Sequence, residues 1–151
     1  MAKKAAKGAG MPWGLASDAG RVARWLADQG LPGPELLADL LDWRDGRSHV
    51  EAPPDVGLAW ADHPLALDPV VVGTVCADLA GRLAEGRVEL GRVRQPLLLG
   101  FALSVVAART ATALVGRWDD SALGVAADHA TGQGSLFATE ANVIVEPGHL
   151  N

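Results

Sequence analysis

The sequence predicts an α+β protein in which an N-terminal helical hairpin and two further helices are followed by a C-terminal antiparallel sheet. Two observations lead to this fold class. Apolar residues recur at helical spacing in several stretches of the first two thirds of the chain, and glycine or proline bounds these stretches. The last third instead holds short β-rich runs that are separated by turn residues.

The hairpin is predicted from two adjacent helical patterns. The first covers residues 15–29 and is ended by Gly30 and Pro32. Its expected inner face consists of Leu15, Ala19, Val22, Ala23 and Leu26. The second has Pro34 in its first turn and ends before Asp45. Its expected inner face consists of Leu36, Leu37, Leu40, Leu41 and Trp43.

The next segment, 44–67, carries three prolines and little periodicity. We interpret it as an exposed loop with one short strand at 56–60. Asp68 as N-cap and Pro69 behind it then predict a single helix that continues to about residue 85. The face expected to be buried in this helix consists of Val71, Val75, Leu79 and Leu83.

A short strand is predicted at 86–93, and Pro96 begins a buried apolar helix that continues to about residue 109. The remaining residues are expected to form the rest of the sheet. Strand candidates at 111–118 and in the two runs that flank the turn Thr-Gly-Gln-Gly lead to a final strand at 142–147.

Composition limits the class of protein. The 151 residues are most simply one α+β domain at 11–151, preceded by a flexible basic N-terminus at 1–10. A single cysteine, Cys76, fits a reducing cytoplasm, where we expect the protein to reside. The most apolar stretch has 13 residues, from Pro96 to Ala108, against the roughly 20 needed to cross a bilayer. We therefore expect no membrane association.

The distribution of charge argues against nucleic acid as a partner. All three lysines lie in the first seven residues, and the rest of the chain has ten arginines against eighteen acids. An acidic body repels a polyphosphate backbone. The second helix of the hairpin also carries Glu35, Asp39 and Asp42 on its outer side, which disfavours a DNA-reading helix-turn-helix.

The glycines near the N-terminus, in GAGMPWG, do not predict a nucleotide site. No strand precedes them, Pro12 removes a backbone N–H, and the P-loop spacing is absent. The stretch resembles the N-terminal signature of an uncharacterised bacterial family, a domain of unknown function, with the pattern KxAxGAGxPWGxAxxAGxxxRWL over 4–26. The resemblance is looser in the Pro-led apolar helix and in Arg117-Trp118-Asp119, and it implies no established activity.

Two Asp-His dipeptides are the main candidates for chemistry, Asp62-His63 and Asp128-His129. If their loops met, they would suit a divalent metal or a base with its orienting acid. They lie far apart in the sequence and no His pair has helical spacing, so no metal ligand is assigned. Cys76 is expected to pack in the core rather than to act as a nucleophile.

The arginines Arg82, Arg87, Arg92 and Arg94 alternate with Glu85 and Glu89. We interpret them as a solvated mixed-charge face, with an anion clamp as the alternative.

Two classes of function stay open. The first is a non-catalytic binding or assembly module that associates with itself or with another protein, because the chain has small-residue helix faces, several tryptophans and a sheet edge. The alternative is a small-molecule enzyme or an accessory subunit of a metabolic enzyme, with His63 or His129 as base and an arginine as anion clamp. The predicted ligand-binding residues are Trp13, Trp60, Asp62, His63, Asp128, His129 and Gln133. Substrate and cofactor stay open.

Overall fold

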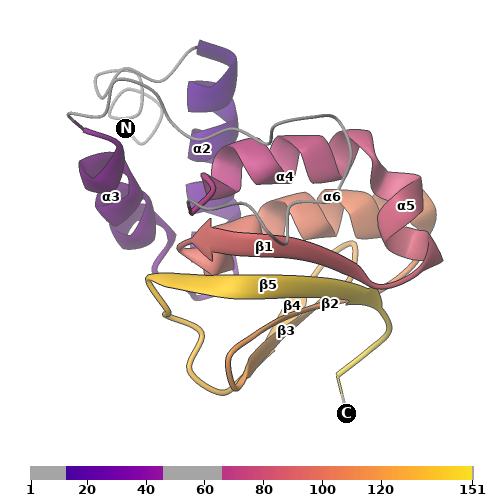
Figure 1. The fold of residues 1–151 in the computed structure, drawn as a ribbon. Coiled ribbons are helices and arrows are strands. Elements are labelled where there is room, and N and C mark those ends of the chain that lie inside the picture. The colour runs from indigo at the N-terminus through magenta and orange to yellow at the C-terminus, as the bar shows by residue number, and fades with distance from the viewer. Residues whose placement is uncertain (1–12, 46–65, 151) are drawn as a thin grey trace.

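The computed structural model describes residues 13–45 and 66–150, and in them the protein has two layers. Helices lie over one face of an antiparallel sheet, as Figure 1 shows. The helical elements are α2 (Trp13–Asp28), α3 (Gly33–Arg44), α4 (Pro69–Asp78), α5 (Ala80–Glu85), the 3₁₀ helix η1 (Pro96–Leu99) and α6 (Gly100–Thr110). The strands are β1 (Val88–Arg94), β2 (Leu114–Trp118), β3 (Ser121–Val125), β4 (Ala130–Gln133) and β5 (Glu140–Pro147). The predicted α+β class, with N-terminal helices and a largely C-terminal antiparallel sheet, is confirmed.

The five strands are ordered β1-β5-β2-β3-β4, and every pair of neighbours is antiparallel. Consecutive hairpins join β2, β3 and β4, whereas β5 returns to lie between β1 and β2. β1 is therefore held in the sheet by its pairing with β5, although the whole of α6 and three strands separate the two in the sequence.

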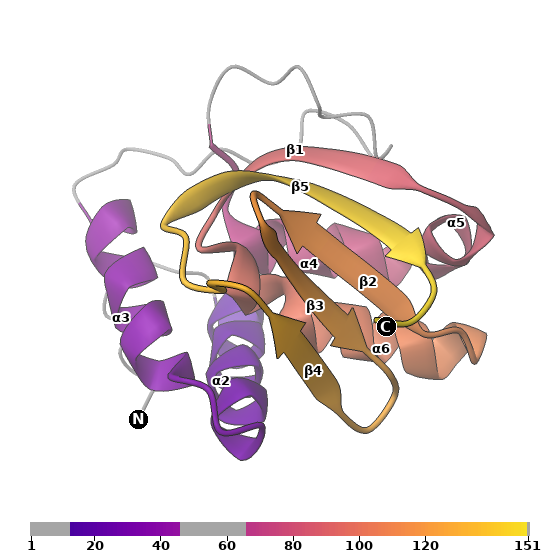
Figure 2. The ribbon, with the colours of Figure 1, turned by 90° about the horizontal axis from the view of Figure 1, so that it is seen from below.

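The core lies between the helices and the inner face of the sheet. Strand residues such as Val143 and Val145 are fully buried there. Gly116 shows how close the layers are, since a Cβ on it would lie 3.3 Å from Leu103 Cδ1 of α6. Figure 2, which views the molecule from below, shows the sheet in front of α4 and α6.

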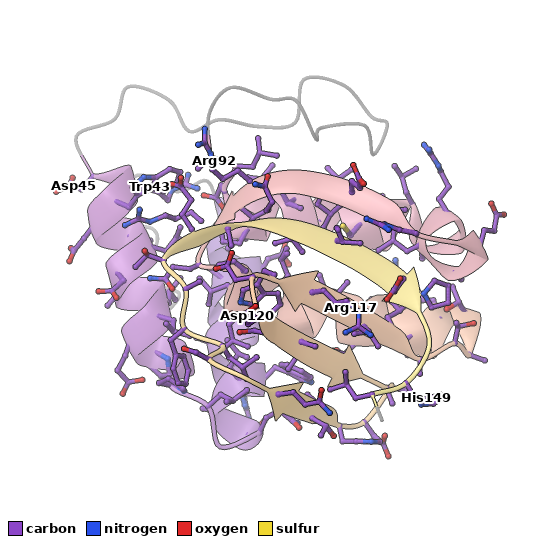
Figure 3. The ribbon with its side chains drawn as sticks, turned by 60° about the horizontal axis from the view of Figure 1, so that its bottom comes forward. Trp43, Asp45, Arg92, Arg117, Asp120 and His149 are labelled. Atoms are coloured by element: carbon purple, nitrogen blue, oxygen red, sulfur yellow. The ribbon has the colours of Figure 1, made fainter. Side chains whose placement is uncertain are left out.

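Charged side chains lie across this outer face of the sheet. Arg117 Nε is 2.7 Å from Glu146 Oε1, and Arg92 and Arg94 approach Glu140 at 3.4 and 3.9 Å. Arg94 also lies over the ring of Trp43, 5.6 Å from its centroid, and so connects β1 to α3. Figure 3 shows Trp43 and Arg92 near each other at this end of the sheet, and Arg117 on its outer face.

The hairpin of α2 and α3 forms as predicted. The predicted inner residues from Ala19 to Leu41 are buried, whereas Trp43 is only half-buried and the side chain of Leu15 lies outside the described part. The outward residues Arg21, Arg24 and Asp28 are exposed. Gly33 lets the two helices meet, because a Cβ there would overlap the carbonyl oxygen of Ala23 and lie 2.9 Å from Leu26 Cβ.

The single helix predicted over 69–85 is wrong, because Leu79 leaves helical geometry at φ −109° and divides it into α4 and α5. The residues of α4 that face inward also differ from the predicted ones. Val71 and Val75 are only half-buried, whereas Val70, Val72 and Cys76 are buried. The apolar helix predicted from Pro96 also starts differently, since its first four residues form η1.

Leu67 and Asp68 anchor the chain where it enters α4. Leu67 forms a parallel bridge with Val93 of β1, and its N–H donates to the carbonyl of Arg92 at 2.9 Å. The basic N-terminus at 1–10 and the short strand predicted at 56–60 lie outside the described residues. Among the helices of the described residues, none has both the length and the apolar character that a membrane span requires.

Candidate functional site

A cleft with a volume of about 270 Å³ lies on the outside of the helical layer. We call it the three-helix cleft, because α2, α4 and α6 form its walls, with Leu98 of η1 contributing to the lining. Its lining residues are Asp18, Arg21, Val22, Pro69, Val70, Gly73, Thr74, Ala77, Asp78, Leu98, Phe101, Ala102, Val105 and Arg109.

Local sequence positions α4 along this cleft. The Asp68 carboxylate accepts hydrogen bonds from the backbone N–H groups of Val70 at 2.7 Å and Val71 at 3.3 Å, which fixes the start of the helix. Gly73 then allows close contact with α6, since a Cβ on it would lie 2.9 Å from Ala102 Cβ. The two helices therefore meet beneath the cleft and close it from below.

The floor of the cleft is apolar. Val22, Val70 and Leu98 are almost completely buried, and Phe101 and Val105 are half-buried. The hydroxyl of Thr74 donates to the carbonyl of Val70 at 3.0 Å, so the backbone of its own helix already satisfies it. The floor thus offers apolar surface with little competing polar chemistry.

The rim of the cleft carries charges of both signs. On the α2 side, Arg21 Nη1 lies 3.1 Å from Asp18 Oδ1 in an exposed pair one turn apart. On the other side, Arg109 Nη1 donates to the backbone carbonyl of Ala77 at 2.8 Å. That contact places the guanidinium of Arg109 at the C-terminal end of α4, the helix whose last residue is Asp78.

The predicted site residues are only partly described. Trp60, Asp62 and His63 lie outside the described residues, and Trp13 is the first residue of α2. Asp128 and His129 stand together in the turn between β3 and β4, with His129 Nδ1 2.8 Å from Asp128 Oδ1. The imidazole lowers the pKa of the Asp128 carboxyl through this hydrogen bond and its charge.

The turn that follows β3 does not meet the start of α2. The side-chain oxygen of Gln29, just beyond the end of α2, accepts a hydrogen bond from the backbone N–H of Ala130 at 3.1 Å. The turn therefore lies at the C-terminal end of a 16-residue helix that is about 24 Å long, and Trp13 lies at the other end. Gln133 ends β4 and is exposed.

His129 lines a smaller pocket that sequence reasoning did not anticipate, with a volume of about 150 Å³. His149, from the C-terminal segment after β5, lines the same pocket. No local sequence pattern predicts that His129 and His149 share a pocket, because this depends on β5 returning to the middle of the sheet.

The other candidates from the sequence are Cys76 and four arginines. Cys76 is buried, which raises its thiol pKa to about 12, so the expected core role is confirmed. Arg82 and Arg87 are exposed, and Arg87 pairs with Glu89 at 3.4 Å. Arg92 and Arg94 pair with Glu140 on the outer sheet face, so these four arginines do not converge with the cleft. No group of three potential metal-ligating side chains occurs within 13–45 and 66–150.

A family model described as protein of unknown function (DUF3726) matches residues 1–62. This match confirms the resemblance of the N-terminal stretch to a domain of unknown function. The described part of the matched range comprises α2 and α3, and so includes Asp18, Arg21 and Val22 of the cleft. No match was found among curated proteins or among solved structures.

Proposed function

We propose that the chain is a non-catalytic binding module and that the three-helix cleft is its binding site. The observation that carries this proposal is the lining of the cleft, in which an apolar floor lies between rims bearing Asp18 and Arg21 on one side and Asp78 and Arg109 on the other. Concave apolar sites with a few polar groups at their edges are typical of small-molecule binding.

The size of the cleft restricts what it binds. Its volume of about 270 Å³ is close to the lower end of the range for ligand pockets, which is roughly 300–1,000 Å³. A small organic molecule with an apolar body therefore fits the cleft better than a large cofactor does.

Binding of a small apolar probe tests whether the cleft is a site. Benzene enters an enclosed apolar cavity of about 150 Å³, which is smaller than this cleft, and saturation-transfer NMR detects its contact with the protein. Ala77 lines the cleft and is half-buried, so Ala77→Phe should fill it and abolish the benzene signal. Ala27 is exposed on α2 and does not line the cleft, so Ala27→Phe serves as the matched control and should retain the signal.

If benzene does not bind, or binds equally well to both variants, the proposed site is wrong. Native mass spectrometry of the purified chain adds a second test, because it reports a retained ligand and the number of associated copies together. A retained small molecule that is absent from Ala77→Phe would support the cleft. The same spectra test the expected self-association.

The hydrogen-bonded Asp128–His129 pair favours an enzyme or accessory subunit as the second candidate. His129 is 65% exposed and lies in the smaller pocket, which shares no lining residue with the three-helix cleft. A binding module should therefore keep its cleft ligand in His129→Ala. Loss of a measured turnover in a folded His129→Ala variant would instead support the enzyme.

A further inference from the structure

We infer that the ligand of the three-helix cleft is a free α-amino acid with an apolar side chain. This inference rests on the proposed function and adds the ligand class to it. The relevant residues are Arg109 and Asp78 at one end of the cleft and the apolar floor that extends from them.

The first argument is the balance of charge. Two carboxylates and two guanidiniums line the cleft, so their formal charges cancel. A ligand of only one sign gains attraction from half of these groups and repulsion from the other half. A zwitterion with an apolar body matches both the charged rim and the floor.

The second argument is that Arg109 is already positioned. One of its N–H groups donates to the carbonyl of Ala77, which holds the guanidinium against the last turn of α4. A guanidinium has five N–H donors, so others remain for a ligand carboxylate. Two parallel hydrogen bonds from arginine to a carboxylate provide strength and orientation.

The third argument concerns the ligand's ammonium group. Asp78 is the last residue of α4, directly after Ala77, and it has no ion-pair partner within the described part of the chain. The C-terminal end of a helix also favours positive charge, because its last carbonyl groups point outward. An ammonium beside Asp78 would gain from both effects.

The spacing of these groups suits an α-amino acid. Arg109 of α6 reaches the carbonyl of the residue that precedes Asp78, so its guanidinium and the Asp78 side chain both lie at the C-terminal end of α4. An α-amino acid carries its carboxylate and ammonium on one carbon atom and therefore needs adjacent receptors.

From that end of α4, the lining residues Ala77, Gly73 and Val70 follow one another at helical spacing along the floor. The ligand side chain would lie over them, towards Val22 and Leu98. The cleft volume of about 270 Å³ corresponds to about nine water molecules at their liquid volume of ~30 Å³, which is room enough for a small molecule such as leucine.

Calorimetric titration with three related compounds tests the inference. Leucine carries both charges, 4-methylpentanoate lacks the ammonium, and 3-methylbutylamine lacks the carboxylate. We expect leucine to bind at least tenfold more tightly than either analogue. Equal affinities for the three compounds would overturn the inference.

Two variants assign the charges to residues. Arg109→Gln should weaken leucine at least tenfold while leaving 3-methylbutylamine unchanged, and Asp78→Asn should weaken leucine while leaving 4-methylpentanoate unchanged. Arg82→Gln removes an exposed arginine outside the cleft and should change none of these affinities. Circular dichroism of each variant confirms that it is folded.

The benzene experiment separates the two levels of the proposal. If Ala77→Phe blocks benzene but leucine has no advantage over its analogues, the cleft is a binding site and the amino-acid inference is wrong. If Ala77→Phe has no effect on benzene, the site itself is wrong, and leucine binding unaffected by that variant would confirm the failure.

Discussion

Arg44 and Asp68 form a buried ion pair that joins the last turn of α3 to the first residues of α4. Arg44 Nη1 donates to Asp68 Oδ2, while Asp68 Oδ1 accepts from the N–H groups that begin α4. The Asp68 carboxylate thus caps the start of α4 and neutralises the charge of Arg44 at the end of α3. Because α4 forms one wall of the three-helix cleft, this pair also helps to position the proposed site.

Asp68→Asn should strongly destabilise the protein. The substitution leaves the Arg44 charge buried without its carboxylate, and breaking a buried pair in this way costs about 3–5 kcal/mol. Urea denaturation followed by circular dichroism measures the loss. Adding Arg44→Met should recover part of it, because the unpaired charge is then removed as well.

The exposed pair of Arg87 and Glu89 provides the matched control. Surface ion pairs contribute about 0–1 kcal/mol, so Arg87→Gln should hardly change the denaturation midpoint. A similar, small effect for Asp68→Asn and Arg87→Gln would show that the buried pair does not join the two helices energetically.

Gly33→Ala should destabilise the helical hairpin by several times the effect of an ordinary surface substitution. The new Cβ would overlap the carbonyl oxygen of Ala23 and approach Leu26 Cβ to 2.9 Å, both on α2. Well-packed cores accommodate such overlap only by shifting backbone, which typically costs about 1–3 kcal/mol. Thermal denaturation checks this result.

Gly81→Ala is the corresponding control, because a Cβ at Gly81 in α5 meets no atom within 4 Å. Alanine is a better helix former than glycine by roughly 0.5–1 kcal/mol, so this variant should melt at a higher temperature than the parent chain. If both variants melted alike, the close crossing of α2 and α3 would not be responsible for the effect.

Local signals predicted much of this fold. Asp68 and Pro69 marked the start of α4, and Gly30 and Pro32 marked the end of α2, because caps and helix breakers act within a few residues. The break at Leu79 was missed, since the sequence there is a continuous good helix pattern and tertiary packing decides the geometry.

The candidate site was the least predictable part. Arg21 and Arg109 look like ordinary outward-facing residues in their own helices, and only the meeting of α2, α4 and α6 places them around one cleft. The insertion of β5 beside β1 is likewise a long-range pairing that no short window contains. The Asp128–His129 contact, by contrast, could be predicted from the sequence, because it joins two consecutive residues.

The thiol of Cys76 should be protected from reagents while the protein is folded. It is completely buried, and burial raises its pKa to about 12, so almost no thiolate forms near neutral pH. With Ellman's reagent, the absorbance should show no reaction in buffer. In about 8 M urea, where the protein is unfolded, it should show one equivalent of thiol. Rapid reaction in buffer would contradict the buried placement.

Stability should fall as the pH rises from about 9 towards 12, and Cys76 should account for part of this fall. Above pH 9 the unfolded thiol, whose ordinary pKa is 9.0, loses its proton, whereas the folded thiol with its pKa of about 12 keeps it. The unfolded state then binds fewer protons, so its free energy falls relative to the folded state by about 1.4 kcal/mol per pH unit.

The chain contains no tyrosine, which removes the usual competing titration in this range. Urea denaturation at about pH 8, 10 and 11 should show this decline in stability in the parent chain and a shallower decline in Cys76→Ala. Parallel declines in the two proteins would mean that other groups, such as the lysines, cause it.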